Sequence, residues 1–308
     1  MKTTSLNLRR SSTLTNNMFD SDEDLEKITI LNSTSVIKIG NDNTGVLMSK
    51  ADGADVFIAV PKAMYNAYKT NFPEYFGNIP SGHFSYFENY TIDGNLTYYW
   101  NVLDENQKIA YIDYVEGTLP TTLEFPSTLD GYTIVMVSKN VMSAISGVTK
   151  VVLPDDMAYL AFTTADMADT IAELQIADGN AKFKTVEGVL YSADGKTLLI
   201  YPRNRAGSIY YVESGASEIA YRAFYGTKNL VTLIINDVVT VRDNAFEKTG
   251  ISVIKFTNST ASVFAGRDIF LDANASLKVR VPGAALTNYR NNVLIDYSII
   301  DNEIIIAA

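Results

Sequence analysis

Residues 218–235 read EIAYRAFYGTKNLVTLII, and residues 240–256 read TVRDNAFEKTGISVIKF with a similar pattern. Phe224 and Phe246 occupy the same place in the two stretches and lie 22 residues apart. In the first stretch, apolar residues fall 5 positions before the phenylalanine and 6, 9 and 11 after it, at Ile219, Leu230, Leu233 and Ile235. An apolar pattern that returns at this period predicts stacked copies of one supersecondary unit.

The same template returns in the second stretch, where it is one residue shorter after the phenylalanine, around Phe19 and Met142, and more loosely around Phe162, where three residues are inserted. Its apolar positions in these copies are Val241, Ile251, Ile254 and Phe256; Leu14, Leu25, Ile28 and Ile30; Val137, Val148, Val151 and Leu153; and Met157, Ile171, Leu174 and Ile176. One unit cannot bury its apolar face alone, so the copies are expected to stack into a solenoid.

The last three apolar positions of each copy read L-x-x-L-x-L, which is the strand segment of a leucine-rich repeat. Successive side chains of a strand point to opposite faces. We therefore predict that Leu233 and Ile235 are buried and that Ile234 between them faces outward.

A second duplication relates VFIAVPKAMYNAYKTN at 56–71 to LKVRVPGAALTNYRNN at 277–292. In each copy a tyrosine, Tyr68 or Tyr289, comes seven residues after the proline. Proline is favoured at the first helical position, so each copy predicts a strand followed by a helix that closes a repeat array.

Two hairpins are expected, at 96–114 around Asp104 and at 186–202, where Asp194-Gly195 is a strong turn signal. The predicted fold class is an α+β repeat: a solenoid with short parallel strands on one face, hairpin inserts and strand–helix closing units. The predicted domains are the end of a repeat array at 1–78, an aromatic-rich junction at 79–95, and a second unit at 96–308 with about four repeats, two hairpins and a closing unit.

The sequence resembles the BspA-type leucine-rich-repeat family of bacterial surface proteins. The resemblance rests on IAYRAFYGTKNLVTLII, on VEGVLYSADGKTLLIYP at 186–202 and on the V-P…Y closing unit, and it covers about residues 14–71 and 96–292. It implies a right-handed solenoid, an extracellular or cell-surface location, and adhesion or protein binding in place of catalysis. Thr227 stands where the family often carries cysteine, which leaves the repeat spacing unchanged.

Composition removes several classes of chemistry. The 308 residues carry 25 Lys and Arg against 35 Asp and Glu, a net charge of −10, which disfavours nucleic acids and anionic membranes as partners. The absence of cysteine excludes disulfides, thiolate zinc sites and cysteine nucleophiles, and His83 is the one histidine. Residues 20–26, DSDEDLE, fail as a calcium loop because Leu25 and Leu31 replace its required Gly and Glu. We predict no metal and no cofactor.

Outward strand positions are the candidate binding residues for a solenoid of this kind: Lys27, Thr29, Lys150, Val152, Glu173, Gln175, Thr232, Ile234, Val253 and Lys255. An aromatic patch at Tyr98, Tyr99 and Trp100 is a further candidate, because rings with polar edges bind proteins and sugars. The alternative is that these rings pack the junction and the first hairpin against the end of the solenoid.

The leading functional hypothesis is a non-enzymatic surface or secreted protein that binds a protein or glycan of a host or neighbouring cell. A structural spacer that presents other domains is the alternative, and a hydrolase with paired carboxylates is a distant third. No stretch is apolar enough to insert in a membrane, and MKTTSLNLRR at the start has no apolar segment of a leader behind it. We expect a leader to lie outside this chain, and the single repeat at 1–78 to be covered by the second unit or by self-association.

Overall fold

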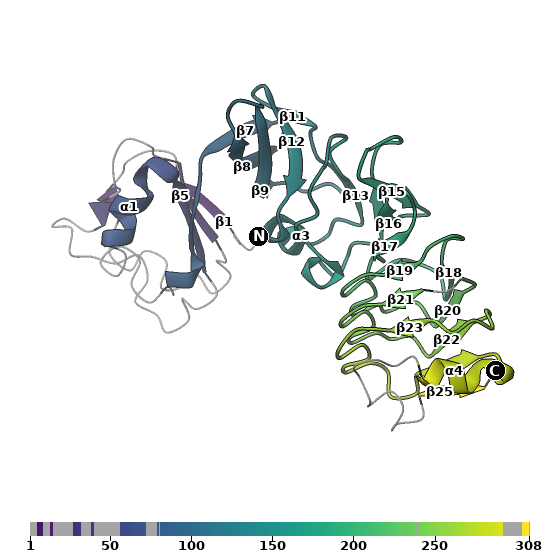
Figure 1. The fold of residues 1–308 in the computed structure, drawn as a ribbon. Helices are drawn as coiled ribbons and strands as arrows, with labels where there is room; N and C mark the ends of the chain where they lie inside the picture. Colours follow the sequence, from purple (N-terminus) through teal and green to yellow (C-terminus); the bar gives the residue numbers. More distant parts are fainter. Residues whose placement is uncertain are drawn as a thin grey trace. The chain divides into compact units, whose positions relative to one another are not determined.

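The computed structural model describes most of the chain and divides it into two compact units, Met1–Val102 and Leu103–Ala308 (Figure 1). The described residues are 5–8, 13–14, 27–31, 38–39, 56–71, 79, 81–237, 239–291 and 304–307. The rejected calcium loop and the template residues Phe19 and Leu25 lie outside them. The predicted boundaries at 78 and 95 stay a prediction.

The first unit is built on a parallel sheet in the order β1 (Ser5–Leu8), β3 (Lys27–Ile30), β5 (Phe57–Pro61), β6 (Phe84–Phe87). Ile28, Ile58 and Val60 are fully buried behind it. The other elements of this unit are β2 (Thr13–Leu14), β4 (Lys38–Ile39), α1 (Lys62–Thr70), η2 (Ser81–His83), β7 (Asn89–Asp93) and the start of β8 (Leu96–Asp104). Residues predicted as a junction thus supply the fourth strand of the sheet.

The second unit begins with a mixed sheet and a short parallel sheet. The mixed sheet contains β9 (Ile109–Gly117), β11 (Thr128–Leu129) and β12 (Tyr132–Val137), and the parallel sheet contains β10 (Thr122–Glu124), β13 (Lys150–Val152) and β14 (Glu173–Gln175). Helix α3 (Lys139–Ala144) begins where the Ser138 hydroxyl accepts a hydrogen bond from the amide of Val141. The turn η3 (Thr164–Asp166) completes this region.

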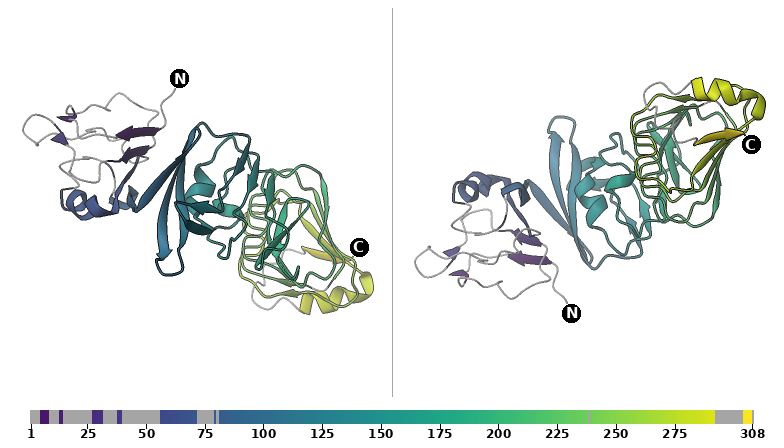
Figure 2. Two further views of the ribbon diagram at one scale, coloured as in Figure 1. Left: turned by 90° about the horizontal axis from the view of Figure 1, so that it is seen from above. Right: turned by 90° about the horizontal axis from the view of Figure 1, so that it is seen from below.

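The rest of the second unit is a stack of coils with a sheet on each of two sides (Figure 2). One side is a six-stranded sheet of β15 (Phe183–Val186), β16 (Val189–Ser192), β17 (Thr197–Ile200), β19 (Glu218–Ile219), β21 (Thr240–Val241) and β23 (Val263–Phe264). The other, here called the five-stranded sheet, is parallel and contains β18 (Ile209–Tyr211), β20 (Thr232–Ile235), β22 (Val253–Phe256), β24 (Lys278–Val281) and β25 (Ile305–Ala307). The coils end in η4 (Gly283–Ala285) and α4 (Leu286–Asn291).

The predicted strand register is confirmed. Leu233 and Ile235 are fully buried, while Ile234 between them is partly exposed. All the described template residues of the second unit are buried as well: Val137, Met142, Val148, Val151, Leu153, Met157, Phe162, Ile171, Leu174, Ile176, Ile219, Phe224, Leu230, Val241, Phe246, Ile251, Ile254 and Phe256. The chain is therefore built of parallel and mixed sheets with few helices, as the repeat pattern predicts.

The closing units and the second hairpin are also confirmed. Strand β5 leads into α1 and strand β24 into η4 and α4, with Tyr68 and Tyr289 fully buried. Pro61 is the N-cap of α1, one residue before the predicted place. Strands β16 and β17 pair antiparallel across Asp194 and Gly195. None of the helices in the described ranges is long and apolar enough to cross a membrane.

Candidate functional site

The outward side of the five-stranded sheet presents two rows of side chains that cross the strands. Parallel pairing places Tyr211 beside Ile234, Ile234 beside Lys255, Lys255 beside Arg280, and Arg280 beside Ile306. The second row contains Ile209, Thr232, Val253 and Lys278. These nine positions are called the outer face below. Their neighbours along the strands point the other way and are buried: Tyr210, Leu233, Ile254, Val279 and Ile305.

The outer face exposes large apolar side chains at its β18 edge. Ile209 is 54% exposed and Tyr211 is 60% exposed. Beside them in register stand the partly exposed Thr232 and Ile234 on β20. A solvated strand face ordinarily carries polar residues at these positions, and exposed apolar side chains that gather on one surface mark an interaction site.

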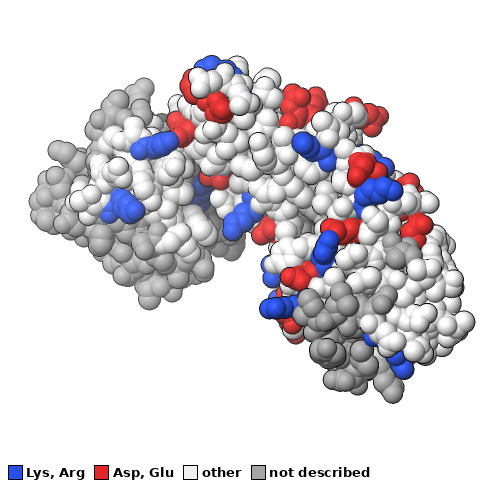
Figure 3. All heavy atoms as spheres, in the orientation of Figure 1, with Lys and Arg blue, Asp and Glu red and all other residues white. Residues whose placement is uncertain are grey.

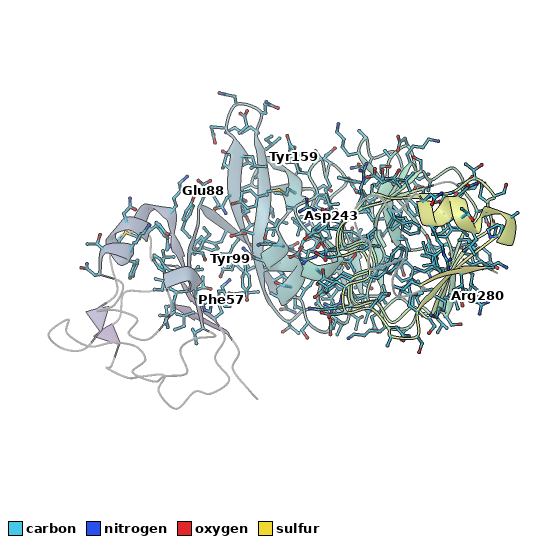
Figure 4. All side chains as sticks on the ribbon, turned by 60° about the horizontal axis from the view of Figure 1, so that its bottom comes forward. Phe57, Glu88, Tyr99, Tyr159, Asp243 and Arg280 are labelled. Carbon is cyan, nitrogen blue, oxygen red and sulfur yellow. The ribbon has the colours of Figure 1, made fainter. Side chains whose placement is uncertain are left out.

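The same face is basic. Lys255, Lys278 and Arg280 lie on two neighbouring strands, and none of the nine positions is acidic. Within the part of the chain that the structure describes, neither Lys255 nor Arg280 forms an ion pair. Arg280 is labelled in Figure 4.

This composition differs from other parts of the second unit. Figure 3 shows several places in the second unit where acidic and basic side chains lie next to one another. The ion pairs of this unit include Arg222–Glu247, with a nitrogen–oxygen distance of 3.1 Å, and Arg205–Glu187, also 3.1 Å. The outer face has no acidic residue among its own nine positions, and Lys255 and Arg280 have no ion-pair partner elsewhere in the described residues.

Tyr210, which points from β18 into the core, holds that strand in place. The hydroxyl of Tyr210 lies 2.7 Å from the hydroxyl of Tyr191, and that of Tyr191 accepts a hydrogen bond from the amide of Glu213 at 3.2 Å. Burial raises the pKa of Tyr210, with the neighbouring Tyr191 adding to the effect, so this side chain stays neutral. The Arg205 guanidinium lies 5.0 Å from the Tyr210 ring centroid. These contacts fix the strand that presents Ile209 and Tyr211.

The predicted outward residues of the second unit divide between two sheets. Thr232, Ile234, Val253 and Lys255 belong to the outer face, whereas Lys150, Val152, Glu173 and Gln175 lie on the parallel sheet of β10, β13 and β14. There Lys150 and Glu173 neutralise each other at 2.7 Å. The amide of Leu174 on β14 donates to the carbonyl of Gly188 at 3.0 Å. Gly188 stands directly before β16, so this hydrogen bond joins β14 to the hairpin insert and not to a strand of the outer face. The predicted single stripe is thus two separate faces.

In the first unit the predicted exposed positions are corrected. Lys27 is 8% exposed and Thr29 is fully buried. The Lys27 ammonium lies 5.5 Å from the centroid of the Tyr99 ring, which is itself 1% exposed. Because both residues are buried, neither offers a free surface.

The aromatic patch is corrected for the same reason. Tyr98, Tyr99 and Trp100 are each at most 2% exposed, so the rings pack inside the molecule. The indole of Trp100 donates to the Thr91 hydroxyl at 3.0 Å, and Tyr99 contacts Phe87 edge-on at 4.9 Å between centroids. Glu88 and Tyr99 are labelled in Figure 4. These contacts lie within the first unit, so the three rings do not form an exposed patch, and their packing against the end of the solenoid stays a prediction.

Five outer-face residues are absent from the predicted set: Ile209, Tyr211, Lys278, Arg280 and Ile306. For the first four, the signal was the alternation of buried and outward residues in SIYYV at 208–212 and LKVRV at 277–281. The second of these is the strand of the closing unit. Aligning it with the repeat strands would have extended the face to Arg280.

Within the residues that the structure describes, no three His, Asp or Glu side chains gather in a way that could hold a metal ion. His83 stacks on the Phe57 ring with centroids 4.1 Å apart and planes 14° apart. The outer face itself carries no carboxylate and no histidine.

No protein-family model matches the chain, and no curated protein matches it. Among solved structures it is similar to a leucine-rich repeat protein from Eubacterium ventriosum ATCC 27560, with a TM-score of 0.45 and 16% identity. The match covers 88% of this chain and 66% of that one, so the chain spans just under two thirds of its length.

Two further structures are similar to this chain. A leucine rich cell surface protein from Faecalibacterium prausnitzii A2-165 has a TM-score of 0.35 and 13% identity, over 99% of this chain and 88% of that one. The pneumococcal vaccine antigen PcpA has a TM-score of 0.24 and 12% identity, over 71% of this chain and 98% of that one. The predicted resemblance is confirmed: the chain is similar to leucine-rich proteins of bacteria.

Proposed function

We propose that this chain is a non-enzymatic, secreted or surface-exposed leucine-rich-repeat protein that binds a macromolecule through the outer face. The observation that supports this most is that exposed apolar side chains share the face with Lys255 and Arg280, which form no ion pair with any residue that the structure describes. Ile209 and Tyr211 are more than half exposed, and Lys255 and Arg280 lie two and three strands away.

The shape of the surface favours a macromolecule over a small ligand. Stacked parallel strands about 4.8 Å apart present side chains on a broad, open surface, whereas small molecules bind in concave pockets. A large partner can contact many such side chains at once, and buried aromatic and arginine residues then supply most of the binding energy. Tyr211 and Arg280 are the residues of that type on this face.

The right-handed winding of the coils and the extracellular location are parts of the same proposal. Connections between parallel strands of one sheet are right-handed in nearly all proteins, which supports the first. The resemblance to bacterial surface proteins supports the second. A role without catalysis is supported by the composition of the outer face, because its nine residues include no histidine and no carboxylate, which are common general acids and bases.

The test is binding of the labelled full chain to whole bacterial and host cells and to coated extracellular matrix proteins. The variant Ile209→Ser/Tyr211→Ser removes the apolar edge of the face. The matched control, Leu271→Ser/Tyr159→Ser, removes one aliphatic residue and one tyrosine that are 44% and 55% exposed elsewhere. Tyr159 is labelled in Figure 4.

We expect the face variant to lower saturable binding at least about tenfold, since hot-spot aromatic residues contribute about 2 kcal/mol or more. The control should bind like the unchanged protein. Equal binding by both variants, or no saturable binding at all, would contradict the proposal and favour the spacer alternative.

A further inference from the structure

We infer that the outer face binds an acidic polypeptide segment that also carries apolar side chains. This inference rests on the proposed function and names the class of partner. Its basis is the succession of apolar and then basic side chains from β18 to β24, together with the absence of any acidic residue from the nine positions of the face.

Lys255 on β22 and Arg280 on β24 favour a negatively charged partner. Lys255 and Arg280 are direct neighbours in the register of β22 and β24. Like charges opposite each other on adjacent strands repel and destabilise the free sheet. Carboxylates placed between them would remove that repulsion, and an arginine can bind one through two parallel hydrogen bonds.

The apolar side chains of the outer face argue against a purely polar anion as the partner. Tyr211 and Ile234 occupy the same row as the two cations, and Ile209 and Val253 occupy the other. Covering these side chains is favourable only if the partner brings apolar surface of its own, at roughly 25 cal/mol for each Å² buried. A sulfated or uronic-acid glycan offers charge without that surface.

Glycans and nucleic acids fit less well on two further grounds. Sugar hydroxyls both donate and accept hydrogen bonds, and the outer face offers them only the hydroxyls of Thr232 and Tyr211 as side-chain acceptors, with no carboxylate or amide among its nine residues. A long phosphate backbone would meet a chain whose net charge is −10. A polypeptide supplies carboxylates and apolar groups in one molecule.

The strand register also predicts how far apart the apolar and the acidic residues of the partner should lie along its chain. Along one row, Tyr211 and Ile234 stand on β18 and β20, and Lys255 and Arg280 stand on β22 and β24. The centres of the apolar pair and the basic pair are two strand spacings apart, roughly 10 Å. An extended chain advances about 3.3 Å per residue, so apolar and acidic residues about three positions apart would match the row.

The experiment titrates the full chain against three probes by fluorescence anisotropy. They are a random copolymer of glutamate and tyrosine, polyglutamate of the same length, and heparin. We expect the copolymer to bind at least about tenfold more tightly than polyglutamate, since only the copolymer has apolar side chains that can cover Ile209, Tyr211 and Ile234. Raising NaCl from about 50 to 500 mM should weaken its binding, because salt screens exposed charges.

The variants test whether the face itself is responsible. Lys255→Glu/Arg280→Glu should raise the Kd for the copolymer at least about tenfold, and Lys255→Gln/Arg280→Gln should raise it less. The matched control is Lys182→Glu/Arg267→Glu. It makes the same change in charge at one exposed lysine and one exposed arginine beside the six-stranded sheet, neither of them ion-paired in the described residues. Its Kd should stay within about twofold.

Three results would overturn the inference: tighter binding of heparin than of the copolymer, no binding of the copolymer, or an equal loss in the control. Unchanged thermal melts would show that the variants remain folded. If the copolymer fails while Ile209→Ser/Tyr211→Ser still reduces cell or matrix binding, the face binds another class of partner and only this inference is wrong. If that apolar variant binds normally, the proposed function itself is wrong.

Discussion

The ring of Phe224 stacks on the ring of Phe246, with centroids 5.2 Å apart and planes inclined by 22°. The stack continues to Tyr201 on one side, at 5.1 Å, and to Phe270 on the other, at 5.5 Å. Each ring comes from a different turn of the chain, so the ladder joins consecutive coils through their centres. This contact is the physical counterpart of the 22-residue period in the sequence.

Removal of one ring from the ladder should destabilise the second unit strongly. Phe246→Ala is expected to lower the free energy of unfolding by about 3–5 kcal/mol, because the cavity would open between two stacked neighbours. Urea denaturation of the full chain measures this. Leu271→Ala, at a residue that is 44% exposed, is the control and should change it by less than about 0.5 kcal/mol. A loss below about 1 kcal/mol for Phe246→Ala would show that the ladder is not a core element.

A pair of threonines replaces the thiol that the family resemblance leads one to expect. The hydroxyl oxygens of Thr227 and Thr249 lie 2.6 Å apart, and both residues are 2% exposed. Thr227→Val should lower stability by about 1–3 kcal/mol, because it leaves the buried hydroxyl of Thr249 without this partner.

A double-mutant cycle checks the pairing. Once either hydroxyl is gone, the loss of the other should matter less, so Thr227→Val/Thr249→Val is expected to fall short of the sum of the single variants by about 0.5–3 kcal/mol. Additive losses within about 0.3 kcal/mol would mean that the two hydroxyls do not interact.

The fold of the second unit followed from local patterns, because each coil repeats one arrangement of apolar residues. The burial of Leu233 and Ile235 could be predicted, since strand alternation alone decides it. The burial of Lys27 and Thr29 could not, because the ring of Tyr99 that covers Lys27 comes from far along the chain. Contacts between residues so distant in sequence leave no local signal.

The candidate site was predictable in part. Thr232, Ile234, Val253 and Lys255 followed from the repeat template, and the structure places all four on the outer face. Tyr211 and Arg280 did not, because the hairpin insert and the closing unit interrupt the template on either side of the repeats. The hairpin also separates the outer face from the sheet of β10, β13 and β14, which the spacing of apolar residues could not reveal.

Close packing of coils at Gly266 gives a third prediction. A Cβ atom there would lie 2.2 Å from the carbonyl carbon of Arg242, which belongs to the preceding coil. Gly266→Ala should lower stability by about 1–3 kcal/mol, because backbone must move to admit the methyl group. Gly283→Ala is the matched control, since nothing lies within 4 Å of its Cβ position. Equal thermal melts for the two variants would refute the close approach.

The buried tyrosine pair predicts sensitivity to alkali. Burial raises the pKa of Tyr191 and of Tyr210 above the ordinary value of 10.0. A group with a raised pKa in the folded state stabilises the fold below its unfolded value, and that stability is lost as the pH rises through the folded pKa. The free energy of unfolding should therefore fall above about pH 10, by up to about 1.4 kcal/mol per pH unit for each such group.

Tyr210→Phe should make the decline with pH less steep. Urea denaturation at a series of pH values between about 9 and 11.5 measures the slope, with tyrosinate absorbance as a second readout. Tyr211→Phe, one residue further along the same strand and 60% exposed, is the control and should keep the original slope. An unchanged slope for Tyr210→Phe would contradict the role of the pair.

The central claim is that neighbouring residues of β20 face opposite sides, so that the outer face is open to a partner. The chain contains no cysteine, so a single introduced thiol reports its own accessibility to a maleimide reagent. Ile234→Cys should react rapidly in the folded protein, whereas Leu233→Cys should react at least about 100-fold more slowly because it must wait for local opening. A Leu233→Cys thiol that reacts as fast as the Ile234→Cys thiol would contradict the register and the outer face together.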